Sequence, residues 1–192
     1  MAMIALSLLL SALVMPAQSP GQALFDRGMT WEAFFDAADA RRELWQANRR
    51  RARESATRPE MVERLETAGS GLSLLVIAEA ACSDSVNTVP FIAELAAGAG
   101  IELRIVRRDA GESLLAKYKT PDGRMATPTV VLMRGGQDVG AWVERPAALQ
   151  DWMIASTGIR SSERLERKMA WYDWDRGDST VADFLEVVER AR

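Results

Sequence analysis

The sequence predicts an α/β fold, in which a central mixed four-stranded sheet is flanked by helices and extra helices precede and follow it. Apolar runs of strand length alternate with helical segments between about residues 72 and 154, in the order β-α-β-α-β-β-α. Glycine-rich turns separate several of these elements. The 192-residue chain is 48% hydrophobic, so it can form one domain with a sizeable core.

Residues 24–69 are predicted to be a helical extension that precedes the sheet. Thr30 is a suitable N-cap for a helix whose apolar residues recur at helical spacing as far as Trp45. Residues 57–60 have the spacing of a capping box and predict a second, short helix that continues through Leu65.

Residues 70–157 are predicted to form the sheet-containing domain. Its expected strands are residues 72–78, 101–106, 129–133 and 139–143, and its expected helices are residues 83–97, residues 112–118 and a helix that opens at Pro146. The two strand-helix-strand connections favour parallel pairing, and Gly135-Gly136 favours a hairpin between the last two strands. Pro90 should kink the first helix because it lacks a backbone N–H.

Residues 158–192 are predicted to form a C-terminal helical extension that packs on the domain. One amphipathic helix carries Leu165 and Tyr172, and a second begins near Ser179. The tryptophans of this half of the chain are expected in the core or between the domain and the tail; they are Trp142, Trp152, Trp171 and Trp174.

Residues 1–20 are interpreted as a signal or anchor segment. Met1 to Met15 are almost wholly apolar, but this run is shorter than the roughly 20 residues that span a bilayer. No Lys or Arg precedes it, and the sequence around Pro16 is a poor cleavage site. Three alternatives stay open: an export signal that directs the protein to the periplasm, a retained anchor, or a misassigned start in a cytoplasmic protein.

Composition excludes several classes of function. The net charge of −3 gives no bulk attraction to nucleic acid. The absence of histidine excludes Ser-His-Asp and Cys-His catalysis, and one cysteine without histidine leaves no zinc ligand set. We therefore expect no metal and no resident cofactor.

Cys82 is the single cysteine of the chain. It cannot close an intrachain disulfide, so any redox chemistry requires a mixed disulfide with another molecule or direct oxidation of the sulfur. The alternative is a buried cysteine that behaves as a small hydrophobic residue.

The residues around Cys82 resemble the thioredoxin-like superfamily. Residues 82–85, Cys-Ser-Asp-Ser, look like its C-x-x-C motif with serine at the second thiol position. Pro90 follows the cysteine by eight residues, where thioredoxins have a helix-kinking proline. Thr127-Pro128 looks like the cis-proline element, which in this superfamily faces the active cysteine.

The chain is most similar to a group of poorly characterised bacterial thioredoxin family proteins with a monothiol C-x-x-S motif. The resemblance runs from about Leu24 to the C-terminus and rests on the cysteine motif and on four further segments, which are residues 30–35, 126–129, 142–146 and 171–177. Two departures from the active superfamily pattern stand out. Ala81 replaces the usual tryptophan, which puts the partner surface in doubt, and Ser85 replaces the resolving cysteine, which rules out dithiol turnover.

The motif permits moderate activation of the sulfur. A helix N-terminus favours a thiolate at Cys82, whereas the carboxylate of Asp84 repels one. No Lys, Arg or His lies within several residues of Cys82. Ser85 could donate a hydrogen bond to the thiolate; alternatively, Asp84 or Ser85 simply caps the helix. The resemblance implies that Thr127 and Pro128 dock an extended peptide or glutathione.

Two functions follow from these residues. In the first, Cys82 carries out thiol-disulfide exchange through a mixed disulfide with glutathione or a protein thiol, and Ser85 and Asp84 tune the sulfur. Glutathione would then be a co-substrate. In the second, the chain is a non-enzymatic module that binds a peptide or partner at an inactive C-x-x-S site.

Overall fold

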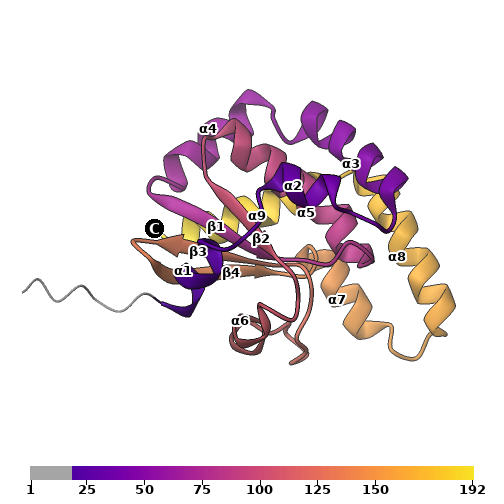
Figure 1. Ribbon diagram of the computed structural model, residues 1–192. Coiled ribbons are helices and arrows are strands. Elements are labelled where there is room, and N and C mark those ends of the chain that lie inside the picture. The colour runs from indigo at the N-terminus through magenta and orange to yellow at the C-terminus, as the bar shows by residue number, and fades with distance from the viewer. Residues whose placement is uncertain (1–18) are drawn as a thin grey trace, which may run out of the picture.

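The computed structural model describes residues 19–192, and these form a four-stranded sheet with helices on both faces (Figure 1). The strands are β1 (Leu72–Ile77), β2 (Leu103–Val106), β3 (Thr129–Arg134) and β4 (Gln137–Val143), in the spatial order β2-β1-β3-β4. The predicted fold class, a mixed four-stranded sheet flanked by helices, is confirmed.

The sheet mixes parallel and antiparallel pairs. β1 is parallel to β2, whereas β3 is antiparallel to both β1 and β4, and β3 and β4 form the predicted hairpin. The prediction that both crossovers give parallel pairs is therefore wrong for the second. Its helix, α6 (Glu112–Lys117), has six residues and is only about 9 Å long. The chain consequently stays at the end of the sheet where β2 ended, and β3 starts there.

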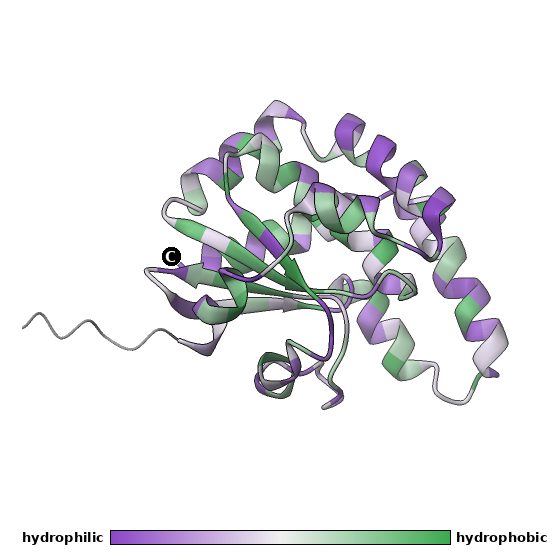
Figure 2. Cartoon of the chain, viewed as in Figure 1, coloured by the Kyte–Doolittle hydropathy of each residue, from purple (hydrophilic) through white to green (hydrophobic). Residues whose placement is uncertain are grey.

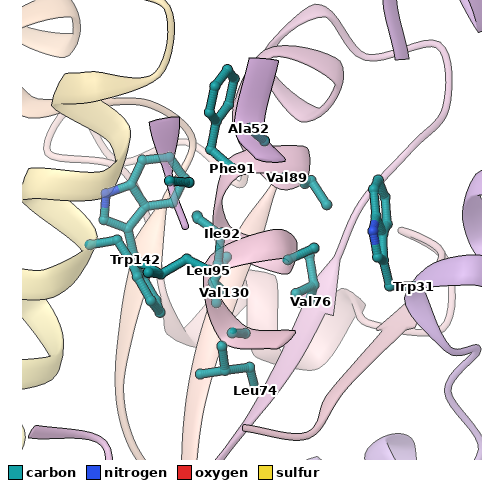
Figure 3. Packing of buried hydrophobic residues seen from close by; sticks show 14 of the residues in the cluster. Trp31, Ala52, Leu74, Val76, Val89, Phe91, Ile92, Leu95, Val130 and Trp142 are labelled. Carbon is teal, nitrogen blue, oxygen red and sulfur yellow. The ribbon is translucent and has the colours of Figure 1, made fainter. Parts of the chain in front are cut away.

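The larger core lies between one face of the sheet and five helices. These are α2 (Trp31–Asp36), α3 (Arg42–Ser55), α4 (Pro59–Ala68), α5 (Ser83–Gly98) and α9 (Asp178–Arg190). Figure 3 shows Leu74 and Val76 of β1 close to Ile92 and Leu95 of α5. Pro90 lies inside α5, as predicted.

The opposite face of the sheet is covered by α1 (Pro20–Phe25) and α6 (Figure 1). The sequence analysis missed α1. Ser19 caps it by accepting a hydrogen bond from the backbone N–H of Gln22, and the Ser19 hydroxyl donates to the carbonyl of Gly136 in the β3–β4 turn. Residue 19 onward is thus part of the fold. The rest of the predicted signal or anchor, residues 1–18, lies outside the described residues.

The aromatic helix that was predicted from Thr30 to Trp45 is two helices. Thr30 caps α2 as expected, but α2 ends at Asp36, and α3 begins after Arg41, whose φ of 55° is left-handed. In a straight helix Trp31 and Trp45 would lie about 21 Å apart. The break allows their ring centroids to approach to 6.1 Å in the core.

The predicted capping box is also wrong in detail. α4 forms, but its N-cap is Arg58, which makes no side-chain cap hydrogen bond. The Thr57 hydroxyl donates instead to the carbonyl of Arg53 at the end of α3. The Thr57 side chain therefore bonds to the preceding helix α3 instead of capping α4.

After β4 come α7 (Ala147–Ala155), α8 (Ser161–Asp175) and α9. Trp142 is buried as expected, but Trp174 is 77% exposed, which corrects the expectation that it packs in the core or between the domain and the tail. Figure 2 shows the strands mostly in the hydrophobic colour and much of the outer surface of the helices in the hydrophilic one. Among the residues that the structure describes, no helix combines the length and apolarity needed to cross a bilayer.

Candidate functional site

Cys82 lies where the loop after β1 turns into α5. It is the N-cap residue of that helix, with extended dihedrals of φ −72° and ψ 125°. The side chain is half-buried, and the thiol donates a hydrogen bond to the backbone carbonyl of Thr127, with an Sγ–O distance of 3.2 Å. The sulfur thus lies at the positive end of the α5 dipole and within reach of solvent.

Thr127 and Pro128 stand directly opposite the sulfur, at the start of β3. The peptide bond between them is cis. The Thr127 carbonyl accepts from Cys82, and the Pro128 carbonyl accepts from the backbone N–H of Glu144 at 2.7 Å. The structure therefore brings three of the predicted site residues together. A docking role for Thr127 and Pro128 stays a prediction.

Ser85 is fully buried in the first turn of α5. Its hydroxyl oxygen accepts a hydrogen bond from the backbone N–H of Glu79 at 3.4 Å. The N-cap of α5 is Cys82 rather than Asp84 or Ser85, so neither of these side chains caps the helix. The expected hydrogen bond from Ser85 to the sulfur stays a prediction.

Asp84 is the centre of a buried charge cluster, the Asp84 cluster, which also contains Arg145, Lys168 and Tyr172. Asp84 is 5% exposed, and its carboxylate accepts from the Tyr172 hydroxyl at 2.7 Å, from Lys168 Nζ at 2.8 Å and from Arg145 Nη2 at 3.2 Å. Burial first, and then the charge of Asp84, holds the pKa of Tyr172 well above its ordinary value. The Tyr172 hydroxyl therefore stays protonated and available as a donor.

A chain of ion pairs continues from this cluster toward the surface. Arg145 also pairs with Glu144, and Glu144 in turn accepts from Arg124 at 3.1 and 2.9 Å. Asp122 completes the chain, since Arg124 Nε donates to it at 2.6 Å. That hydrogen bond is the main reason why the pKa of Asp122 falls to about 2.

Two cations adjoin the residues on either side of Cys82, although none lies near it in sequence. Lys168 Nζ donates to the Ser83 hydroxyl at 2.8 Å, and Arg41 Nε donates to the carbonyl of Ala81 at 2.8 Å. Lys168 is paired with Asp84, so its charge is largely balanced. The sequence-based expectation of moderate activation of the Cys82 sulfur took neither cation into account.

Sequence reasoning identified Cys82, Asp84, Thr127 and Pro128 but missed the partners of Asp84. Arg145, Lys168 and Tyr172 lie 61, 84 and 88 residues further along the chain. Arg145 and Tyr172 fall in segments that carried the family resemblance, and that resemblance was the only sequence signal for a role of these two residues. Lys168 lies outside those segments, so no sequence signal pointed to it. Spacing within one helix cannot show which distant cation meets a buried carboxylate.

Comparisons with known proteins agree with this fold. A family model described as thioredoxin matches residues 28–163. The crystal structure of a protein of unknown function from Pseudomonas aeruginosa is similar with a TM-score of 0.65 at 24% identity, covering 88% of this chain and 96% of that one. An HIV epitope scaffold is similar with a TM-score of 0.68 at 22% identity, covering 88% and 98% respectively. No curated protein matches the chain. At such identities the two structures show the fold alone.

Proposed function

Because the chain belongs to the thioredoxin family, we propose that it carries out thiol–disulfide exchange through one cysteine, with Cys82 forming a mixed disulfide with glutathione or a protein thiol. One observation carries this proposal. The half-buried sulfur of Cys82 lies at the N-terminus of α5, 3.2 Å from the carbonyl that precedes Pro128. A sulfur at the start of a helix and open to a partner is the arrangement that favours a nucleophilic thiolate.

The exchange proceeds in two balanced steps. The Cys82 thiolate attacks one sulfur of a partner disulfide; a bond from Cys82 to that sulfur forms, the partner S–S bond breaks, and the second partner sulfur leaves with the electron pair and takes a proton from water. Release requires an external thiol such as glutathione. Its thiolate attacks the partner sulfur of the mixed disulfide and returns Cys82 as a thiolate. Ser85 cannot replace this thiol because a hydroxyl does not attack the disulfide.

Thr127 and Pro128 dock the partner beside the sulfur, and Asp84 and Ser85 tune it. An extended chain laid against the backbone of Thr127, just before β3, would pair with it through main-chain hydrogen bonds, as in peptide recognition by strand addition. Export, which the apolar residues 1–15 suggest, would place the thiol in a compartment rich in disulfide partners.

The single cysteine makes a direct test possible. We would incubate the folded chain with oxidised glutathione at pH 7 and follow the mixed disulfide by intact-mass spectrometry. The same chain unfolded in urea provides the reference rate for an unactivated Cys82, and N-acetylcysteine in both solutions corrects for the solvent. The proposal expects a rate several-fold faster in the folded chain, and no adduct on Cys82→Ser. A folded rate equal to or slower than the unfolded one contradicts it.

A non-enzymatic binding module is the second candidate, and one contact favours it. The thiol donates its hydrogen bond to the Thr127 carbonyl, and such a bond stabilises the protonated sulfur rather than the thiolate. In this case the surface beside Pro128 would hold a peptide without covalent chemistry. A slow folded rate in the exchange experiment would favour this candidate.

A further inference from the structure

A cavity of about 340 Å³ lies between the loop before β3 and the turn that joins α7 to α8. Three arginines line it: Arg124, Arg145 and Arg164. They come from distant parts of the chain, so the cavity is a product of the tertiary fold. Its volume is on the order of ten water molecules, which leaves room for several heavy atoms.

The charges around the cavity leave one cation without a carboxylate. Arg124 pairs with Asp122 and Glu144, and Arg145 pairs with Asp84 and Glu144. Arg164 instead donates to two neutral oxygens, Ser156 Oγ at 3.2 Å and the Met153 carbonyl at 2.6 Å. Within residues 19–192 it makes no ion pair.

Arg145 provides a second, independent observation. It is 6% exposed, and its Nε and Nη1 atoms are buried without a hydrogen-bond partner in the part of the chain that the structure describes. Buried donors of a charged group are costly to leave unpaired. Both atoms are sealed from solvent, so the guanidinium must shift before either can meet an acceptor in the cavity.

We propose that this cavity binds a small organic acid. Its carboxylate meets the guanidinium groups of Arg164 and Arg145, because the planar fork of arginine matches two carboxylate oxygens. Its short apolar part lies against Met153 and Ile154, which also line the cavity. An inorganic oxyanion would meet the same arginines but leave the apolar wall uncovered.

Binding at this cavity does not require the thiol. Arg164 lies one helical turn before Lys168 on α8, and Lys168 contacts Ser83 beside the sulfur, so the two sites are neighbours. Cys82→Ser should nevertheless bind the acid as the native chain does. The proposal therefore stands or falls separately from the exchange reaction.

The test uses hexanoate and inorganic phosphate as probes at constant ionic strength, followed by NMR at the Ile154 methyl groups and the Thr157 amide. We expect saturable shifts with hexanoate and weaker binding of phosphate. Arg164→Gln should weaken hexanoate binding by about tenfold or more, as the loss of a charge-assisted hydrogen bond implies. Arg167→Gln is the matched control: it removes the same charge from an exposed position of α8 that does not line this cavity.

A second variant covers the possibility that Arg164→Gln disturbs the turn between α7 and α8. Thr157 is exposed and lines the cavity, so Thr157→Glu should fold normally and repel the probe. The proposal is overturned if hexanoate gives no saturable shift, if phosphate binds as tightly, or if Thr157→Glu binds hexanoate like the native chain. Equal weakening by Arg167→Gln would also overturn it.

Discussion

Asp84 and Cys82 are two residues apart at the start of α5, so the charge of Asp84 affects the ionisation of the Cys82 thiol. A carboxylate near the sulfur disfavours a thiolate. The structure moderates this effect, because the Asp84 carboxylate accepts from Tyr172, Lys168 and Arg145 rather than facing the thiol unpaired. Asp84 thus has two roles: its charge affects the sulfur, and its hydrogen bonds hold α8 and the β4–α7 junction against the start of α5.

Asp84→Asn separates these two roles. The substitution removes the negative charge and leaves Lys168 unbalanced beside Ser83, so we expect Cys82 to react several-fold faster with iodoacetamide at pH 7. Breaking a buried ion pair by removing one partner should lower the free energy of unfolding by about 3 kcal/mol. Alkylation rates under native conditions and urea unfolding measure the two effects.

Asp122→Asn is the control for this prediction. Asp122 also pairs with an arginine, but its side chain is 33% exposed and lies at the outer end of the ion-pair chain. It should change both quantities little, since exposed pairs contribute about 0–1 kcal/mol. An Asp84→Asn variant that reacts more slowly than the native chain would show that the carboxylate does not oppose the thiolate.

At the scale of elements, the sequence predicted the features that depend on the spacing of residues close together in the chain. It placed the ends of the four strands to within about two residues, and it placed the start of α5 at Ser83 and the hairpin at Gly135-Gly136 correctly. It missed the break between α2 and α3, because Trp31 and Trp45 keep helical spacing whether or not the chain bends between them. It also missed the direction of β3, which depends on the short reach of α6 rather than on any residue of the strand.

Glu94 joins α3 to α5 at their buried contact. It is 8% exposed and accepts from Trp31 Nε1 at 3.0 Å, Arg49 Nε at 2.8 Å and Arg53 Nε at 3.1 Å. Burial by itself would raise the pKa of this carboxyl, but these three donors outweigh it and hold the pKa below its ordinary value. A carboxyl with a lowered folded pKa stabilises the protein above its unfolded pKa, and this contribution is lost as the pH falls through the folded pKa.

Glu94→Gln should therefore destabilise the protein in a pH-dependent way. At pH 7 we expect a loss of about 1.5–3 kcal/mol, the range for a hydrogen bond to a charged group. As the pH falls through the lowered folded pKa of Glu94, the native side chain also becomes neutral, so the two unfolding curves should converge. Urea titrations across this pH range provide the measurement. Glu32→Gln, whose side chain is 66% exposed, is the control, and a difference that persists unchanged to low pH would contradict the assignment.

At the scale of the whole molecule, the C-terminal helix α9 is part of the larger core. Val181, Phe184, Leu185 and Val188 of α9 belong to the same hydrophobic cluster as the strands and α5. Gly177 makes the approach possible: its φ is 89°, and a Cβ at this position would lie 2.2 Å from Phe91. The chain can therefore reverse between α8 and α9 close against the core.

Phe184→Ala tests whether α9 stabilises the entire fold. Phe184 is fully buried, so its truncation should lower the free energy of unfolding by about 3–5 kcal/mol and leave a single cooperative transition. Trp174→Ala removes a larger ring from the neighbouring helix, but that ring is 77% exposed, and its loss should cost less than about 0.5 kcal/mol. Urea unfolding should be followed in parallel by circular dichroism, which reports the loss of helix, and by alkylation of Cys82, which reports the opening of the site. The two midpoints then show whether α9 and the site unfold together. If Phe184→Ala melts α9 early while Cys82 stays protected to the native midpoint, α9 unfolds independently, and the core that α9 is described as sharing with the sheet and α5 is wrong.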